Sequence, residues 1–401
     1  MVTPTVRIGA VPPPKPTLPK GAWFFAALVG ILIGTMCFVT RGELFGVQGD
    51  FYAYWAAVQL FWRGQNPFDA GVIARFDANI VSPPLGPRIA WNPPFLLVFL
   101  SPIAALSYVS ALSIWTGLSL FWGLCTGLMV WGIDSRRAFS VRVWVLATVF
   151  CVPLFSCLKL GQISTLLSCS LALGIWFLSV RRDWLAGLAF VPLCAKPHVF
   201  YLVGVTLLVW FIREGRYRAI VGAGTGLMGA SLLAEVVHPG IHHQWAYRDS
   251  WPTNYAGSTL TALVRQFLIS SSGVDPIFVV CAVMMVGGTV AFFALIQRFP
   301  QARNLPDMVS LSLVISLLTA PYGFVFDQAA LVLAQNRLVA RVYNVKYVRR
   351  LIVGYMFTSL AVIVLSRSDG ESPNLPLYWF VSPLLLLLAW LVVLTVERRD
   401  V

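Results

Sequence analysis

Long apolar stretches dominate the pattern of hydrophobic and polar positions in this chain, and short polar segments separate them. A stretch of about 20 apolar residues crosses the hydrocarbon core of a bilayer as an α-helix, because a helix satisfies its backbone N–H and C=O groups internally. The pattern therefore predicts an all-helical polytopic membrane protein. The twelve predicted spans lie near residues 22–40, 109–133, 143–159, 163–180, 184–195, 198–212, 219–237, 276–297, 307–320, 327–340, 350–366 and 376–396.

Composition excludes a soluble domain of this length, because 58% of the residues are hydrophobic, 11% are charged and the mean hydropathy is +0.78. No small-residue cleavage site follows the first run, so we interpret it as a retained span rather than a signal peptide. The proline-rich residues 1–20 before it are predicted to be a disordered tail. We expect one transmembrane domain over residues 21–396, followed by a short tail, 397–401.

The basic residues predict the orientation, since short cytoplasmic loops collect Lys and Arg. Placing 20 of the 29 Lys and Arg residues inside gives a consistent path with both termini in the cytoplasm. The net charge of +13 then belongs to the cytoplasmic face, where it suits anionic lipid and not nucleic acid. The sequence accordingly predicts membrane lipids as partners and no nucleic acid.

Residues 94–108 look like a further span, yet counting them as one would turn every later basic loop outward. A helix lying along the outer membrane surface resolves this conflict. The first extracytoplasmic loop is then predicted over 41–108, with two such elements at 51–62 and 94–107. A second large outer loop is predicted over 238–275.

Asp50 stands where the first outer loop meets an aromatic segment that includes Tyr52, Tyr54 and Trp55. One interpretation is a helix N-cap, in which the carboxylate accepts hydrogen bonds from free N–H groups. The other is a catalytic carboxylate facing substrates at the membrane boundary. The two roles are compatible, and the neighbouring aromatic side chains suit the flat faces of sugars.

Lys196 lies inside the apolar stretch 184–211, which Pro197 interrupts. A charge at such a break is costly without a partner, so it predicts contact with an anionic head group. The alternative is a lysine that reaches back to lipid phosphates. Arg88, His198 and Arg265 are further candidate cations on the same side.

Several classes of site are not supported by the sequence. His238 and His242 are four residues apart, but Pro239 and Gly240 lie between them and no carboxylate stands at ligand spacing. The chain has no Asp-x-Asp pair, no P-loop and no Gly-x-Ser-x-Gly motif. We therefore predict a site without metal or cofactor.

Four segments resemble, in order, the signatures of glycosyltransferase family 87, described as polyprenol-phosphate-mannose-dependent α-mannosyltransferases of the GT-C fold. They are GDFYAYWAAVQLFWRGQNPFD, WNPPFLLVFLSP, GQISTLLSCSLALGIWFLSVRRDWLAGLAFVPLCAKPH and APYGFVFDQAALVL. The resemblance covers about residues 20–345. It departs from the family at Val325-Phe326, where a more polar residue is often found.

The resemblance implies an inverting transferase that moves a sugar from a polyprenyl-phosphate donor to an acceptor hydroxyl outside the cytoplasm. It makes Asp50 the catalytic base, and family motif positions match at Gln162, Lys196, Tyr322 and Asp327. Mannose is the family default and arabinofuranose an alternative, while the acceptor would be a glycolipid or an envelope glycan. The rival class is a lipid or glycolipid transporter, for which internal repeats would be expected.

From these residues we predict one site with distinct roles. Asp50 is the catalytic base. The predicted phosphate-binding residues are Lys196, His198, Arg265 and Arg88, and the predicted sugar- or acceptor-binding residues are Tyr52, Tyr54, Trp55, Gln162, Tyr322 and Asp327.

Overall fold

The computed structural model describes residues 20–40, 50–78, 89–133, 140–248, 257–273, 275–342, 350, 353–354, 357 and 380–399. In this part of the chain every regular element is an α-helix or a 3₁₀-helix. The all-helical prediction is confirmed. The predictions for residues 1–19, for the span 350–366 and for Arg88 lie outside the described residues.

The helices follow one another along the chain with short connections. Their bounds are α1 Lys20–Val39, α2 Asp50–Trp62, α3 Ala70–Ala78, α4 Phe95–Leu100, η2 Ser101–Ala105, α5 Tyr108–Ile133, α6 Val141–Val149, α7 Pro153–Leu160, α8 Ser164–Ser179, α9 Asp183–Phe190, η3 Val191–Ala195, α10 Tyr201–Arg213, α11 Tyr217–Val237, α12 Ile241–Ala246, α13 Leu260–Ser272, α14 Ile277–Arg298, η5 Pro300–Ala302, α15 Leu305–Thr319, η6 Val325–Ala330, α16 Leu331–Val342 and α18 Val381–Arg399.

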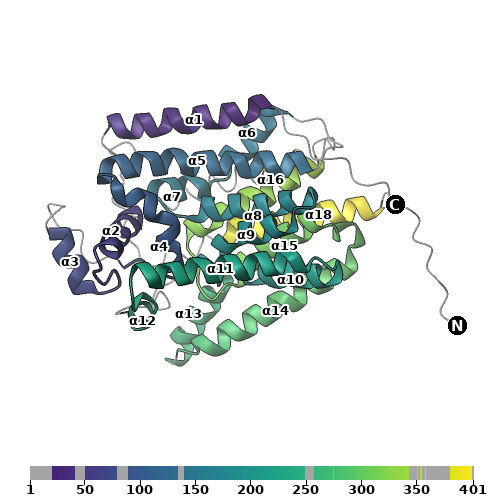
Figure 1. The fold of residues 1–401 in the computed structure, drawn as a ribbon. Helices are drawn as coiled ribbons and strands as arrows, with labels where there is room; N and C mark the ends of the chain where they lie inside the picture. Colours follow the sequence, from purple (N-terminus) through teal and green to yellow (C-terminus); the bar gives the residue numbers. More distant parts are fainter. Residues whose placement is uncertain are drawn as a thin grey trace.

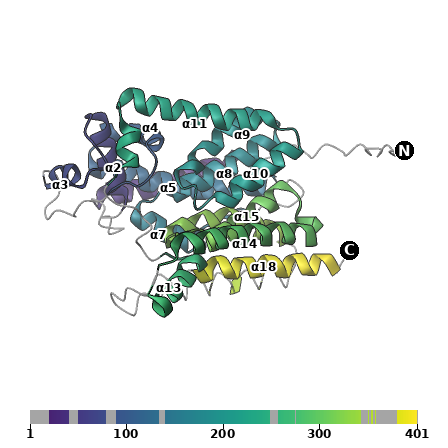
Figure 2. The same cartoon turned by 90° about the horizontal axis from the view of Figure 1, so that it is seen from below.

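The long helices lie roughly side by side in one bundle (Figure 1). The short helices α2, α3 and α13 gather at one end, and α18 ends at the other, in both views (Figures 1 and 2). Helix α15 is buried along nearly its whole length at the centre of the bundle. By contrast, α1, α11 and α14 expose large apolar side chains such as Phe24, Val236 and Phe278. Apolar surface of this extent suits contact with lipid rather than water.

Five helices are long and apolar enough to cross a membrane, or six if the pair α6 and α7, bent by 67°, counts as one broken span. They are α1, α5, α11, α14 and α18, and each overlaps a predicted span. The chain is thus a polytopic membrane protein. The other described spans of the prediction fall on shorter helices, which include α8, α10 and α15. The count of twelve therefore stays a prediction.

The two helices expected along the outer surface are present as α2 and the continuous pair α4 and η2. Helix α2 differs from a surface-lying helix, because Phe51 to Ala57 are all buried within the protein. It packs against α4, η2 and α5. Burial on this scale makes α2 a rigid part of the bundle, so it holds its N-terminal residue in a defined position.

Gly161 ends α7 in a left-handed conformation, with φ of 67°. A side chain is disfavoured there by the backbone conformation, and an added Cβ would collide with Phe51 on α2. The indole N–H of Trp115 donates to the Gly161 carbonyl over 2.8 Å. This close approach brings the next residue, Gln162, to the start of α2.

Candidate active site

Asp50 is the first residue of α2, where the helix dipole favours a carboxylate. One of its carboxylate oxygens accepts a hydrogen bond from the side-chain amide of Gln162, 112 positions along the chain. Asp50 is only partly buried, so the carboxylate remains accessible from the cavity described below. This position is compatible with both roles considered from the sequence.

Gln162 connects Asp50 to the rest of the site. Its amide oxygen accepts from the Tyr54 hydroxyl over 2.8 Å and from the Lys196 ammonium over 2.9 Å. With the oxygen taken by two donors, the amide nitrogen is directed at Asp50. Both polar ends of this buried side chain are therefore engaged, which fixes its orientation.

Lys196 follows η3 at the break that Pro197 introduces, and its ammonium group is almost enclosed. It forms an ion pair of 2.6 Å with Asp327 and lies 4.9 Å from the centre of the Phe326 ring. The other Asp327 oxygen accepts from the Phe324 N–H over 2.9 Å. The structure thus brings together Lys196 and Asp327, 131 positions apart, as one buried pair.

A cavity of about 590 Å³ opens beside these residues. Its lining contains seven of the residues predicted from the sequence: Asp50, Tyr54, Gln162, Lys196, His198, Tyr322 and Asp327. The His198 and Tyr322 rings stack with centroids 3.9 Å apart. His198 lies in the turn between η3 and α10, and burial lowers its pKa to about 4. The imidazole is therefore neutral at neutral pH and acts through hydrogen bonds or ring contacts.

The opposite side of the cavity comes from residues that the sequence analysis did not assign to the site. Arg248 follows α12, and its guanidinium donates to the Trp245 carbonyl over 2.7 Å. The Trp245 indole donates to the Trp91 carbonyl over 3.1 Å, which ties α12 to the first outer loop. Asn92 donates to the Ala195 carbonyl over 3.0 Å. The available signal was an arginine among aromatic residues in the second outer loop.

Four residues predicted to bind substrate do not line this cavity in the described structure. The Tyr52 hydroxyl donates to Asp77 over 2.7 Å in a buried contact. The Trp55 indole donates to the Leu106 carbonyl over 3.1 Å, and its ring packs on Phe76. Arg265 is paired with Asp275. Arg88 is outside the described residues. For Tyr52 and Trp55, the aromatic segment of α2 turns one face to the cavity and these rings into the protein.

The histidines considered as metal ligands are engaged separately. His238 stacks on Phe61 and contacts the Phe61 carbonyl over 3.1 Å, whereas His242 contacts Glu235 over 2.7 Å. Among the described residues, no three His, Cys, Asp or Glu side chains form a group suited to a metal ion.

The arrangement combines an accessible carboxylate, a neutral amide, cations and aromatic walls, as base-assisted group transfer would require. The sequence model of glycosyltransferase family 87 matches residues 91–321, more than half of the chain. That segment includes Gln162, Lys196, His198 and Arg248. No curated protein and no solved structure matches the chain. The chain belongs to glycosyltransferase family 87.

Proposed function

We propose that this glycosyltransferase moves a sugar, with inversion, from a polyprenyl-phosphate donor to a hydroxyl of a lipid-linked or envelope glycan. The observation that carries the proposal is the cavity in which Asp50 is held by a neutral amide rather than by a cation in its described contacts. A carboxylate held in this way keeps its capacity to accept a proton. A carboxylate already ion-paired, such as Asp327, is less suited to that role.

In the proposed reaction, Asp50 takes the proton of the acceptor hydroxyl while its oxygen attacks the anomeric carbon. The bond between that carbon and the phosphate oxygen breaks, and its electron pair leaves with the polyprenyl phosphate. A phosphate monoester is a good leaving group, so no leaving-group acid is needed. Single displacement places the base and the phosphate on opposite faces of the sugar.

Gln162 orients the base in this scheme, because its amide nitrogen donates to Asp50 while its oxygen is fixed by Tyr54 and Lys196. Lys196 and His198 stand on the proposed donor side. His198 is neutral, so it would contribute a hydrogen bond and not a charge. Lys196 contributes positive potential, which Asp327 partly compensates.

The sugar and acceptor would bind against the aromatic walls. Tyr54 and Tyr322 offer hydroxyl groups, and the rings of Trp91 and Trp245 line the same cavity. Mannose is the proposed sugar and arabinofuranose the alternative, both from the family resemblance. The polyprenyl chain would lie along the apolar helices within the membrane.

We further propose that the protein belongs to the bacterial inner membrane, with the site on the extracytoplasmic side and both termini in the cytoplasm. The support is the excess of Lys and Arg in the loops assigned to the cytoplasm. The cavity residues come from the end of the bundle that contains α2 and α12, while α18 ends at the opposite end (Figure 1).

The test is transfer by the purified protein in non-ionic detergent, with farnesyl-phosphoryl mannose or farnesyl-phosphoryl arabinofuranose as donor. Lipid-linked glycans extracted from cells lacking the gene supply the acceptor. The expected result is one added sugar by mass spectrometry, absent with Asp50→Asn. If neither donor is consumed by a folded preparation, the proposed donor class is wrong.

A further inference from the structure

The cation closest to Asp50 in the hydrogen-bond network is poorly placed to hold a phosphate. The Lys196 ammonium already contacts a carboxylate and an amide oxygen, at 2.6 and 2.9 Å. The Phe326 ring covers another side of it. Asp327 is itself held by the Phe324 N–H and the Ser164 hydroxyl, so it is not available to move away. An incoming phosphate would have to compete with a carboxylate that the fold has anchored.

The cavity lining offers a second cation, Arg248, from a different part of the chain. Arg248 is 8% exposed, and its guanidinium lies 4.6 Å from the centre of the Trp245 ring. Its hydrogen bond to the Trp245 carbonyl and the stacked ring hold it in one orientation. Because Trp245 is in turn anchored to Trp91, the guanidinium is positioned before any ligand enters.

Burial lowers the pKa of Arg248 from its ordinary value, while interaction with Tyr322 opposes that change. Arginine nonetheless stays protonated, so the site retains a partly desolvated positive charge beside the cavity. An anion entering the cavity would compensate that charge. The planar guanidinium presents paired N–H donors that match phosphate oxygens, which a lysine cannot do.

The charges along the lining separate into two groups. Lys196 and Asp327 compensate each other as an ion pair. Among the described lining residues, this leaves Asp50 on the Gln162 side and Arg248 on the Trp245 side. A displacement with inversion needs the base and the phosphate on different sides of the sugar, and these two residues come from separate walls.

Resting on the proposed function, we propose that Arg248 binds the phosphate of the polyprenyl donor and that Lys196 acts as a positioning residue for Gln162. The division replaces the sequence-based assignment of Lys196 as the main phosphate ligand. It also gives a binding role to the second outer loop. Arg265, from that same loop, is paired with Asp275 and does not line the cavity.

The test measures binding and does not depend on turnover. Farnesyl phosphate, the product-like probe, is titrated into purified protein in non-ionic detergent by calorimetry, beside farnesol, which lacks the phosphate. Arg248→Gln should weaken farnesyl phosphate at least about tenfold, as expected for a lost charged hydrogen bond, and leave farnesol unchanged. Arg248→Lys should recover part of the loss, because it restores charge without the planar geometry.

Arg63→Gln is the matched control. Arg63 also lies over an aromatic ring, Phe76, but it is exposed and does not line the cavity. Its farnesyl phosphate affinity should equal that of the wild type. Retained farnesol binding by Arg248→Gln shows that the variant is folded.

Three outcomes would overturn the inference. Farnesyl phosphate affinity unchanged in Arg248→Gln, or lost instead in Lys196→Gln or Arg265→Gln, assigns the phosphate elsewhere. Phosphatidylglycerol displacing the probe as well as farnesyl phosphate does would make this a general anionic-lipid contact. A wild type that binds no farnesyl phosphate contradicts the proposed donor class itself, so that failure is distinguishable from a wrong residue.

Discussion

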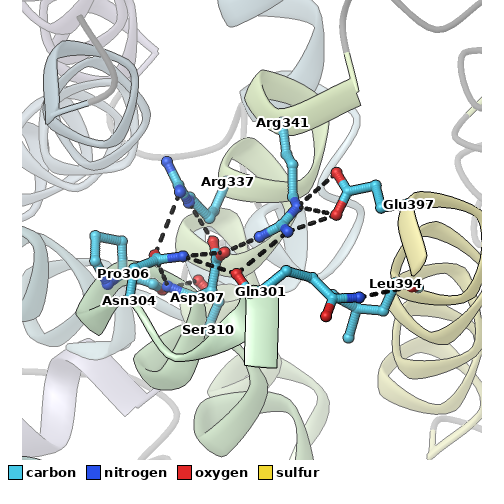
Figure 3. A network of polar contacts seen from close by, with 9 residues as sticks. All are labelled: Gln301, Asn304, Pro306, Asp307, Ser310, Arg337, Arg341, Leu394 and Glu397. Carbon is cyan, nitrogen blue, oxygen red and sulfur yellow. Dashed lines mark hydrogen bonds and ion pairs between the residues drawn. The ribbon is translucent and has the colours of Figure 1, made fainter. Parts of the chain in front are cut away.

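The protein contains two buried clusters of carboxylates and cations, and their partners differ. The cavity cluster consists of Asp50, Gln162, Lys196 and Asp327. The arginine cluster consists of Asp307, Arg337, Arg341 and Glu397, on α15, α16 and α18 (Figure 3). Both join helices that are distant in sequence. The cavity cluster lines an open space, whereas the arginine cluster packs between helix ends.

In the arginine cluster, both oxygens of Asp307 contact a guanidinium. Arg337 binds one over 2.6 Å and Arg341 binds the other, which Asn304 also contacts over 2.6 Å. Arg341 continues to Glu397 over 2.5 Å, which connects α16 to α18 (Figure 3). In the cavity cluster, the described partner of Asp50 is a neutral amide. A carboxylate saturated by cations serves to join helices, whereas one held by an amide beside a cavity remains able to accept a proton.

The largest effect on activity is expected at Asp50. Asp50→Asn keeps the shape of the side chain but removes the proton acceptor, so turnover should fall at least about 10²-fold. Turnover is measured with purified donor and acceptor, and thermal unfolding should be nearly unchanged. Near-normal turnover in Asp50→Asn would remove the catalytic half of the comparison.

Asp307→Asn should have the opposite profile. It leaves two buried guanidinium groups without their carboxylate, and breaking a buried ion pair costs about 3–5 kcal/mol of stability. A lower unfolding midpoint by size-exclusion after heating should accompany a normal turnover per folded molecule. A turnover loss without a stability loss would mean that the arginine cluster acts on the reaction.

Gln162→Ala tests the connection within the cavity cluster. It removes the amide that orients Asp50 but keeps the base itself, so the maximal rate should fall about tenfold. Farnesyl phosphate affinity should stay close to that of the wild type, since the amide is proposed to act on the base. If affinity falls and the maximal rate does not, Gln162 belongs to the donor site instead.

His198 predicts a smaller, pH-dependent effect on stability. Its pKa is lowered from the ordinary 6.5 to about 4 by burial, so between these values the unfolded chain binds more protons than the folded one. Stability should therefore decrease as pH falls from about 6.5 towards 4. His198→Gln should show a weaker decrease in unfolding midpoint over this window. Equal pH dependence in both proteins would show that His198 contributes none of it.

The smallest expected effect is that of metal removal. The chain has no Asp-x-Asp pair, and in the cavity Asp327 contacts Lys196 while Asp50 contacts an amide. Transfer should therefore proceed at the same rate in excess chelator. A rate lost in chelator and restored by Mg²⁺ or Mn²⁺ would require Asp50 or Asp327 to act as a ligand.

Local patterns in the sequence predicted the helices and several site residues well. Apolar stretches identified α1, α5, α11, α14 and α18, because a span must be continuously apolar whatever surrounds it. The family resemblance, stated over about residues 20–345, is confirmed over 91–321. The membrane count failed to become definite because α8, α10 and α15 are apolar but short, and length alone does not decide whether they cross.

By itself, the sequence determined the membrane class, the family and the presence of chemically active residues at Asp50, Gln162 and Lys196. Only the tertiary structure decided which of them meet. Lys196 pairs with Asp327 across 131 positions, Arg248 joins the lining, and Tyr52 turns away. Helical periodicity and hydropathy are local properties, whereas ion pairs and cavity walls depend on how distant helices pack.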